Sequence, residues 1–481
     1  MKLFRSVAII FLLAATSLAS DDTVAKLDKL LNAYHEAGLL NGVVLVADHG
    51  EVIYQKGFGY ANFEWQVPNT TDTKFRIGSV TKPFTAILVL QQVEAGKIKL
   101  DAPVSEYLPE YRADTGAKVT IRHLLTHTSG IPTYKAPQIL EQTSPIAKPE
   151  LVKKWCGGDL EFEPGTSWGY NNCGYLLLGL ILERSTGKPY TQLLRERILI
   201  PAGMNDSGVD TSQLFLSKRA YGYEWSPLAG LRPGPYSEIS TALGTGDIYS
   251  TAEDMFRFDR ALYGDKLLSA KTRELMFTPA TQRGGLGWFV RTAPKEHPAA
   301  GRTLQFHEGH IFGFFTMYTR VPETETMVLT IDNTDMDTFD EIQREIFNVL
   351  YRGTCTLPKK PIAREFARAM REQGMDAAVA QYRTLKKTNS SEYDRDNWRA
   401  LNRLGYALLH AGETSKAVAV FALNVEYFPN QWEAWDSAGE GLAADGQREP
   451  AITHYKKSLE LNPANKDGQA MLKKLLEQKA N

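Results

Sequence analysis

The sequence lacks several features that point to common classes of function. Basic and acidic residues are nearly balanced, at 55 and 56, so no surplus charge indicates a nucleic-acid or anionic-membrane partner. Beyond the N-terminus no apolar stretch is long enough to span a bilayer, so we expect no integral membrane segment. No His, Asp and Glu residues have metal-ligand spacing and no phosphate loop occurs, so we expect neither a metal nor another cofactor.

Cysteine is also scarce. The chain has three cysteines, Cys156, Cys173 and Cys355, and none stands in a C-x-x-C or zinc-ligand pattern. An oxidising compartment would permit disulfides, but an odd number leaves at least one thiol unpaired. We predict three buried or inert thiols and look for the chemistry of the protein elsewhere.

The N-terminus has the three parts of a signal peptide, over residues 1–19. Lys2 and Arg5 give a positive start, residues 7–15 are apolar, and Ser17-Leu-Ala19 supplies small residues for cleavage. The alternative is a buried first helix. We expect an exported protein, either periplasmic or secreted.

The length of 481 residues indicates two or three domains. Residues 42–47 and 51–56 are predicted to form a β-hairpin, and strand-like runs return at 314–320 and 326–332 before an amphipathic helix that ends near Leu350. Strands at both ends with helices between predict an α/β (α+β) fold, with one antiparallel sheet, flanking helices and an all-helical lobe. We assign this domain to residues 20–353.

A second domain is predicted over residues 362–481, after a proline-containing linker at 354–361. Four pairs of residues recur 34 positions apart, as in the tetratricopeptide repeat: Gly412 and Gly446, Ala417 and Ala451, Phe421 and Tyr455, Pro429 and Pro463. The alternative is a set of unrelated helical hairpins. We expect an all-α array that either binds a protein partner or packs on the first domain.

Ser79 and Lys82 form the most informative pair. Three positions apart on a helix, they share one face, so the amine can reach the hydroxyl. If Ser79 opens the helix, its oxygen lies where free N–H groups and the helix dipole favour negative charge. A lysine activates such a serine only when burial or nearby cations lower the pKa of its amine.

A second S-x-x-K sequence occurs at Ser185 and Lys188. There Gly187 follows an apolar helix expected over 176–183 and is typical of a C-terminal cap. A serine in that place meets the negative end of the helix dipole. We therefore exclude this pair from the predicted site.

Three stretches in order along the chain resemble the penicillin-recognising serine hydrolases. They are Ser79-Val-Thr-Lys82, Tyr170-Asn-Asn172 and His307-Glu-Gly309. The family includes class C β-lactamases, D-Ala-D-Ala carboxypeptidases, D-aminopeptidases and β-lactamase-like esterases. Further stretches at 123–130, 201–204, 246–255 and 285–288 are similar to the same family, so the resemblance covers about residues 27–350.

The resemblance implies a role for each motif residue. Ser79 would be the acylated nucleophile and Lys82 its proton acceptor. Tyr170 would be a second base, with its phenol pKa lowered by the lysine ammonium, and the acid that protonates the leaving group. Asn172 would bond Lys82 and the substrate amide, and the backbone N–H groups of Ser79 and His310 would form the oxyanion hole.

The third motif, with His307 and Gly309 as implied substrate-site residues, departs from the Lys-Thr-Gly of most β-lactamases. A histidine there resembles the peptidase and esterase branches, and Glu308 replaces a threonine that would bind a substrate carboxylate. We expect a serine hydrolase acting on esters or on D-amino-acid amides and peptides, with a small-molecule or peptide substrate as its partner. The alternatives are a β-lactamase, or a catalytically weak penicillin-binding-type receptor that engages a partner through its repeats. His123 and His127 are expected to be structural.

Overall fold

The computed structural model describes residues 21–134, 141–334, 338–388 and 391–477. The predicted signal peptide lies outside these residues. The chain divides into two compact units, which we describe separately. The larger unit comprises Met1–Glu224 and Pro233–Leu357, and the smaller unit comprises Trp225–Arg232 and Pro358–Asn481. Among the described helices none is both long and apolar enough to cross a membrane.

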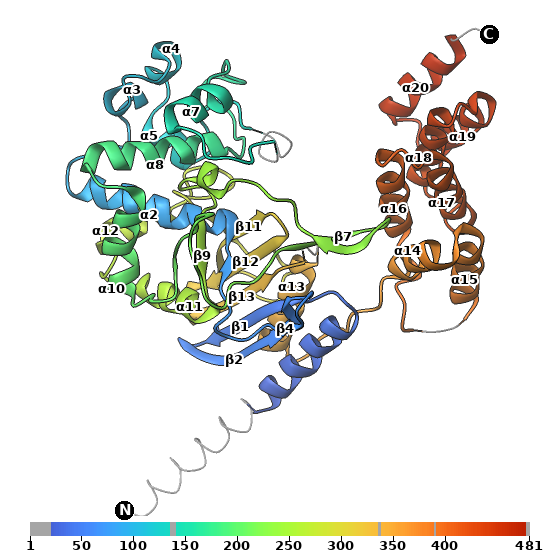
Figure 1. The fold of residues 1–481 in the computed structure, drawn as a ribbon, viewed down its shortest axis with the longest axis horizontal. Helices are drawn as coiled ribbons and strands as arrows, with labels where there is room; N and C mark the ends of the chain where they lie inside the picture. The colour runs from blue at the N-terminus through green and yellow to red at the C-terminus, as the bar shows by residue number, and fades with distance from the viewer. Residues whose placement is uncertain (1–20, 135–140, 335–337, 389–390, 478–481) are drawn as a thin grey trace, which may run out of the picture. The chain divides into compact units, whose positions relative to one another are not determined.

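A six-stranded antiparallel sheet is the centre of the larger unit (Figure 1). Its strands, in order across the sheet, are β10 (Phe289–Thr292), β11 (Thr303–Ile311), β12 (Phe314–Val321), β13 (Thr326–Asp332), β1 (Gly42–Asp48) and β2 (Glu51–Phe58). The N-terminal hairpin pairs with the last strand of the unit through β1 and β13. The predicted hairpin, the two late strands and their union in one sheet are therefore confirmed.

Both faces of this sheet are covered, so successive residues of β1 enter two different hydrophobic clusters. Val43 and Leu45 pack with α2 (Thr81–Glu94) and α8 (Asn172–Thr186). Val44 and Val46 pack with the helix at residues 21–36 and with α13 (Phe339–Arg352). Burying each such side chain stabilises the fold by about 1.5–3 kcal/mol. The predicted amphipathic helix near Leu350 is α13, and it is confirmed.

Most helices of the larger unit lie, along the chain, between strands β1 and β2 and strands β10 to β13. They are α2 (Thr81–Glu94), α3 (Val104–Tyr107), α4 (Ala113–Gly116), α5 (Ile121–Leu125), α7 (Lys148–Cys156), α8 (Asn172–Thr186), α9 (Tyr190–Leu194), α10 (Ile200–Ala202), α11 (Ala252–Ala261) and α12 (Ala270–Phe277). Figure 1 shows α3, α4, α5, α7 and α8 gathered at one end of the unit and the sheet at the other. Helix α2 is apolar almost all round and buried along most of its length, as expected of a helix inside a core.

Short strands complete the larger unit. A two-stranded sheet joins β3 (Tyr60–Asn62) to β4 (Val67–Pro68), and a three-stranded one has the order β5 (Phe75–Arg76), β9 (Ile248–Ser250), β6 (Gly208–Val209). Strand β5 leads directly into the first motif, because the 3-10 turn η1 (Gly78–Val80) and helix α2 follow it. This small sheet therefore fixes the start of the segment that carries Ser79.

Between Ile362 and Glu477 the described residues of the smaller unit form a series of helices. Its helices are α14 (Ile362–Gln373), α15 (Met375–Lys387), α16 (Trp398–His410), α17 (Thr414–Tyr427), α18 (Trp432–Ala444), α19 (Arg448–Leu461) and α20 (Lys466–Glu477). The recurring glycines Gly412 and Gly446 join α16 to α17 and α18 to α19, both with positive φ, and Ala417 and Ala451 are fully buried. The all-helical C-terminal region is confirmed, and its identity as a tetratricopeptide array stays a prediction.

One segment of the smaller unit comes from the middle of the chain. Strands β7 (Tyr223–Ser226) and β8 (Gly230–Pro233) form a hairpin, and its residues 225–232 belong to the smaller unit. The sequence pattern of these strands did not predict the hairpin.

Candidate active site

Ser79 lies in η1, immediately before α2, and Lys82 lies in the first turn of that helix. The Lys82 side chain is completely buried, and its Nζ donates to Ser79 Oγ and to the carbonyl oxygen of Thr245, each at 2.9 Å. The two side chains thus meet as the helical spacing predicts. The serine also stands at the end of α2 where negative charge is favoured.

The environment of Lys82 favours its neutral form. Burial lowers the pKa of the amine well below its ordinary value, and the nearby carboxyl of Asp247 acts in the opposite direction. Burial also raises the pKa of Asp247, to about 7, so the charge that opposes the shift is itself weakened. A neutral amine in contact with Ser79 Oγ is able to accept the hydroxyl proton.

Tyr170 lies beside this pair, with the centre of its ring 5.0 Å from Lys82 Nζ. Burial raises the pKa of its phenol, and a hydrogen bond with Ser79 opposes the shift. This direction contradicts our expectation of a phenol acidified by a lysine ammonium, because the buried lysine favours its uncharged form. A phenol that keeps its proton is suited to act as an acid.

Helix α8 begins at the second motif. Asn171 caps it, since its side chain accepts a hydrogen bond from the backbone N–H of Gly174 at 2.8 Å. The backbone N–H of Asn172 donates to Thr133 Oγ1 at 3.1 Å. Within the part of the chain that the structure describes, Asn172 makes no hydrogen bond to Lys82, so the implied bond between them stays a prediction for the substrate complex.

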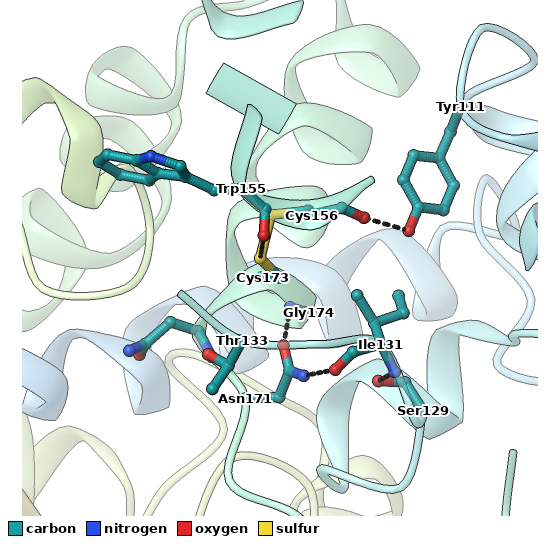
Figure 2. The surroundings of a disulfide bond; sticks show 10 residues. Tyr111, Ser129, Ile131, Thr133, Trp155, Cys156, Asn171, Cys173 and Gly174 are labelled. Atoms are coloured by element: carbon teal, nitrogen blue, oxygen red, sulfur yellow. Dashed lines mark hydrogen bonds between the residues drawn. A yellow bond between two sulfur atoms is a disulfide. The ribbon is translucent and has the colours of Figure 1, made fainter. Parts of the chain in front are cut away.

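A disulfide between Cys156 and Cys173 ties the last residue of α7 to the second residue of α8 (Figure 2). Our prediction of three unpaired thiols is therefore wrong, and Cys355 alone is free. The carbonyl oxygen of Cys156 also accepts a hydrogen bond from the hydroxyl of Tyr111 at 2.9 Å. The bridge adjoins Asn172, so it fixes the end of α8 that faces the site.

Strand β11 brings the third motif against η1. A Cβ at Gly309 would lie 2.0 Å from the carbonyl oxygen of Ile77 and 3.0 Å from the backbone N of Ser79. Gly78, at φ +52°, faces the same contact from the other side, since a Cβ there would lie 2.9 Å from the backbone N of His310. Only glycine permits this contact, which brings the Ser79 and His310 backbones together.

The histidines around the site are held neutral. Burial, with a contribution from Lys82, lowers the pKa of His307 to about 3, and its Nδ1 donates to the Glu308 carbonyl oxygen at 2.6 Å. His127 packs its ring 4.6 Å from that of Tyr170 and accepts a hydrogen bond from the backbone N–H of Asn171. His123 completes a capping box with Thr120 at the start of α5, a structural role as predicted. His127, which we expected to be purely structural, is in direct contact with Tyr170 of the candidate site.

A cavity of about 290 Å³ opens at Ser79. Its walls are formed by Ser79, Tyr134, Asn172, Glu224, Pro235, Thr241, Ala242, Thr245, Gly246, His310, Ile311 and Phe312. The sequence reasoning missed Tyr134 and Glu224, which stand outside every motif. A larger cavity of about 570 Å³ lies between α12 and the strands β10, β11 and β12, but neither serine nor lysine lines it. The smaller cavity is therefore the candidate active site.

Comparison with known proteins agrees with this geometry. The sequence matches the family described as Beta-lactamase over residues 22–351, which is more than half of the chain. The chain belongs to the β-lactamase and penicillin-binding family of serine hydrolases. The family resemblance seen in the three motifs is confirmed. Among the residues that the structure describes, no group of three or more His, Cys, Asp or Glu is arranged to hold a metal ion.

Members of this family with different activities are similar to the chain. Penicillin-binding protein 4* of Bacillus subtilis (strain 168) is 30% identical, over 70% of this chain and 78% of its own length. Esterase EstB of Burkholderia gladioli is 30% identical, over 66% of this chain and 92% of its own. The solved structure of D-amino acid amidase from Ochrobactrum anthropi SV3, complexed with L-phenylalanine amide, has a TM-score of 0.60 at 26% identity, covering 70% of this chain and 99% of the amidase.

Proposed function

We propose that this protein is an exported serine hydrolase that forms an acyl-enzyme at Ser79. The observation that carries the proposal is the completely buried Lys82, with its Nζ 2.9 Å from Ser79 Oγ. Nucleophilic catalysis by serine needs a base in hydrogen-bond contact, and a lysine whose pKa burial lowers meets that need.

Acylation follows from these contacts. Lys82 takes the hydroxyl proton as Ser79 Oγ bonds to the substrate carbonyl carbon, and the backbone N–H groups of Ser79 and His310 stabilise the resulting oxyanion. Tyr170 gives its proton to the departing alcohol or amine as the bond to the leaving group breaks, and Lys82 then returns its extra proton to Tyr170. Water then attacks the carbonyl carbon of the acyl-enzyme as Lys82 takes one of its protons. The bond from that carbon to Ser79 Oγ breaks, Oγ receives the proton from Lys82, and the acid is released.

The proposed substrates are esters, or amides and peptides that contain a D-amino acid. Two relatives named for their activities, an esterase and a D-amino acid amidase, support this class. The exposed Glu308 in the third motif supports it too, because its carboxylate repels a substrate carboxylate such as that of a penicillin. We accordingly rank β-lactam hydrolysis below ester and D-amide hydrolysis.

A panel of chromogenic substrates tests the proposal. The full chain would be assayed with p-nitrophenyl acetate, with D- and L-alanine p-nitroanilide and with a chromogenic cephalosporin, beside Ser79→Ala as control. We expect turnover of the ester or the D-anilide that Ser79→Ala abolishes. A folded protein that turns over none of these substrates would favour the receptor function instead.

A further inference from the structure

His127 has a backbone conformation that few residues other than glycine adopt. Its φ is +59°, and it directly follows Thr126, the C-cap of α5. The backbone N–H of Thr128 donates to the carbonyl oxygen of His123 at 3.0 Å, a bond typical of a helix that ends in a left-handed residue. Glycine is the usual residue there, because a Cβ strains this conformation. A histidine that keeps such a conformation is a candidate for a functional role.

The same residue contacts the chain on both sides of Tyr170. The carbonyl oxygen of His127 accepts a hydrogen bond from the backbone N–H of Gly169 at 2.9 Å. Its Nδ1 accepts another from the backbone N–H of Asn171 at 3.0 Å. The imidazole packs on the phenol ring of Tyr170, with the ring centres 4.6 Å apart. His127 therefore holds the backbone before and after Tyr170 and also contacts its side chain.

These contacts require a neutral imidazole. Because Nδ1 accepts the hydrogen bond from Asn171, the proton of the ring lies on Nε2. Burial, together with the nearby Lys82 and His307, lowers the pKa of the His127 ring well below its ordinary value. The ring therefore stays neutral at working pH, and Nδ1 remains an acceptor.

Tyr170 has two further neighbours in the site, and both lie farther from its ring. Lys82 Nζ is 5.0 Å from the ring centre, and the His307 ring is 6.4 Å away. The imidazole of His127 is thus the nearest of these three groups. A proton donor must be held within a narrow range of positions, since a displacement of about 1 Å is enough to lower a rate about a hundredfold.

We infer that His127 is a positioning residue that holds Tyr170 in place to protonate the leaving group. It acts through Tyr170 and takes no proton itself. This inference rests on the proposed function, in which Tyr170 is the acid. It adds to the site a residue that lies outside the three motifs.

Three acetate esters test the inference on the full chain. They share one acyl group and differ in the group that leaves: p-nitrophenolate leaves without a proton, phenolate leaves less readily, and ethoxide needs a proton. His127→Phe keeps an aromatic ring and loses the acceptor. We expect it to lower kcat/KM for ethyl acetate about 10- to 100-fold and for p-nitrophenyl acetate less than about threefold, with phenyl acetate between them.

A double-mutant cycle shows whether His127 acts through the tyrosine. Tyr170→Phe alone should lower kcat/KM for ethyl acetate by about 10²–10⁴-fold, because the acid is lost. Adding His127→Phe to this variant should cause no further selective loss. His127→Asn keeps an acceptor near the place of Nδ1 and suits the left-handed conformation, so it should recover part of the activity toward ethyl acetate.

His123→Asn is the matched control, because His123 lies in the same segment and caps the start of α5. It should leave the ratio of kcat/KM between ethyl and p-nitrophenyl acetate unchanged. If His127→Phe does not fold, His127→Gly removes the same acceptor at a position that suits glycine, and it should give the same selective loss.

Three results would overturn the inference: no loss in His127→Phe, an equal loss on all three acetates, or a selective loss that persists beside Tyr170→Phe. Turnover of p-nitrophenyl acetate alone by the unaltered protein would overturn it too, since no leaving group is then protonated. Failure of the unaltered protein to hydrolyse any of the three acetates would instead overturn the proposed function.

Discussion

Two S-x-x-K sequences of this chain have the same spacing and opposite surroundings. Ser79 lies at the start of α2 with Lys82 completely buried beside it, and Nζ donates to Oγ. Ser185 lies in the last turn of α8, where its Oγ donates to the carbonyl oxygen of Leu182. Lys188 pairs with Glu196, and 44% of its side chain is exposed.

The comparison shows what the spacing alone does not supply. The serine needs the end of a helix that offers free N–H groups, whereas Gly187, at φ +69°, ends α8 where carbonyl oxygens point outward. The lysine needs burial to favour its neutral form, and an exposed ammonium paired with a carboxylate has no such tendency. We therefore expect substitutions of Ser79 and Lys82 to lower the activity, and the same substitutions of Ser185 and Lys188 to leave it unchanged.

The largest expected effect comes from removing the two serines in turn. Ser79→Ala should lower kcat/KM for p-nitrophenyl acetate by at least about a thousandfold, because the nucleophile is lost. Ser185→Ala should retain the activity of the unaltered protein. Steady-state kinetics of both variants measure kcat/KM. Comparable losses in Ser79→Ala and Ser185→Ala would contradict the assignment of Ser79 as the nucleophile.

Lysine substitution tests the role of the base. Lys82→Ala should lower kcat/KM by about 10²–10⁴-fold, since general-base catalysis is lost, and Lys188→Ala should have no effect. Lys82→Arg keeps a cation that cannot give up its proton, so it should be as inactive as Lys82→Ala. Substantial activity in a folded Lys82→Arg protein would show that Lys82 supplies charge and not a lone pair.

The pH dependence of the reaction should report the lowered pKa of Lys82. The amine must be neutral to accept the Ser79 proton, so kcat/KM should fall as pH drops through the pKa of Lys82 and rise to a plateau above it. Because burial places this pKa well below that of an ordinary lysine, the plateau should begin far below pH 10. A profile of kcat/KM against pH that still climbs at pH 10 would contradict the account.

The disulfide at the N-terminal end of α8 should contribute more to the free energy of unfolding than the ion pair at its C-terminal end. The bridge from Cys156 to Cys173 closes a short loop, at a sequence separation of 17, so the double Cys→Ala variant should lose about 3 kcal/mol in the free energy of unfolding. Urea denaturation measures the change, with Cys355→Ala as a matched control that should leave stability nearly unaltered. Equal stabilities of the double variant and the unaltered protein would mean that the bridge does not constrain this end.

The smallest effect is expected at the exposed end of the same helix. Lys188 makes a surface ion pair with Glu196, and such pairs contribute little because water screens them. Lys188→Ala should therefore change the free energy of unfolding by no more than about 0.5 kcal/mol. A larger loss in urea denaturation would give this pair a structural role that its exposure does not suggest.

Local patterns in the sequence predicted the parts of the fold that depend on local structure. The hairpin of β1 and β2 follows from apolar, β-branched runs around a turn, and the cap at Gly187 follows from the end of an apolar helix. The β7–β8 hairpin has strands of four residues, and its tip is stabilised by contacts with α14, more than a hundred residues away. No local pattern records such a contact.

In the candidate site, too, the features that depend on local spacing were predicted and those that depend on distant segments were not. The spacing of Ser79 and Lys82, with their family resemblance, predicted which residues meet, because three positions on a helix fix one face. The direction of the pKa of Tyr170, the disulfide and the place of Tyr134 in the cavity all depend on how distant segments pack. Burial by those segments decides which groups are charged, and the identity of a residue does not record it.

The central claim is that Ser79, and not Ser185, is the activated nucleophile. The most direct measurement is the intact mass of the full chain after reaction with a fluorophosphonate, beside Ser79→Ala and Ser185→Ala. We predict one covalent adduct on the unaltered protein and on Ser185→Ala, and none on Ser79→Ala. An adduct that persists in Ser79→Ala, or a folded, unaltered protein that forms none, would contradict the account.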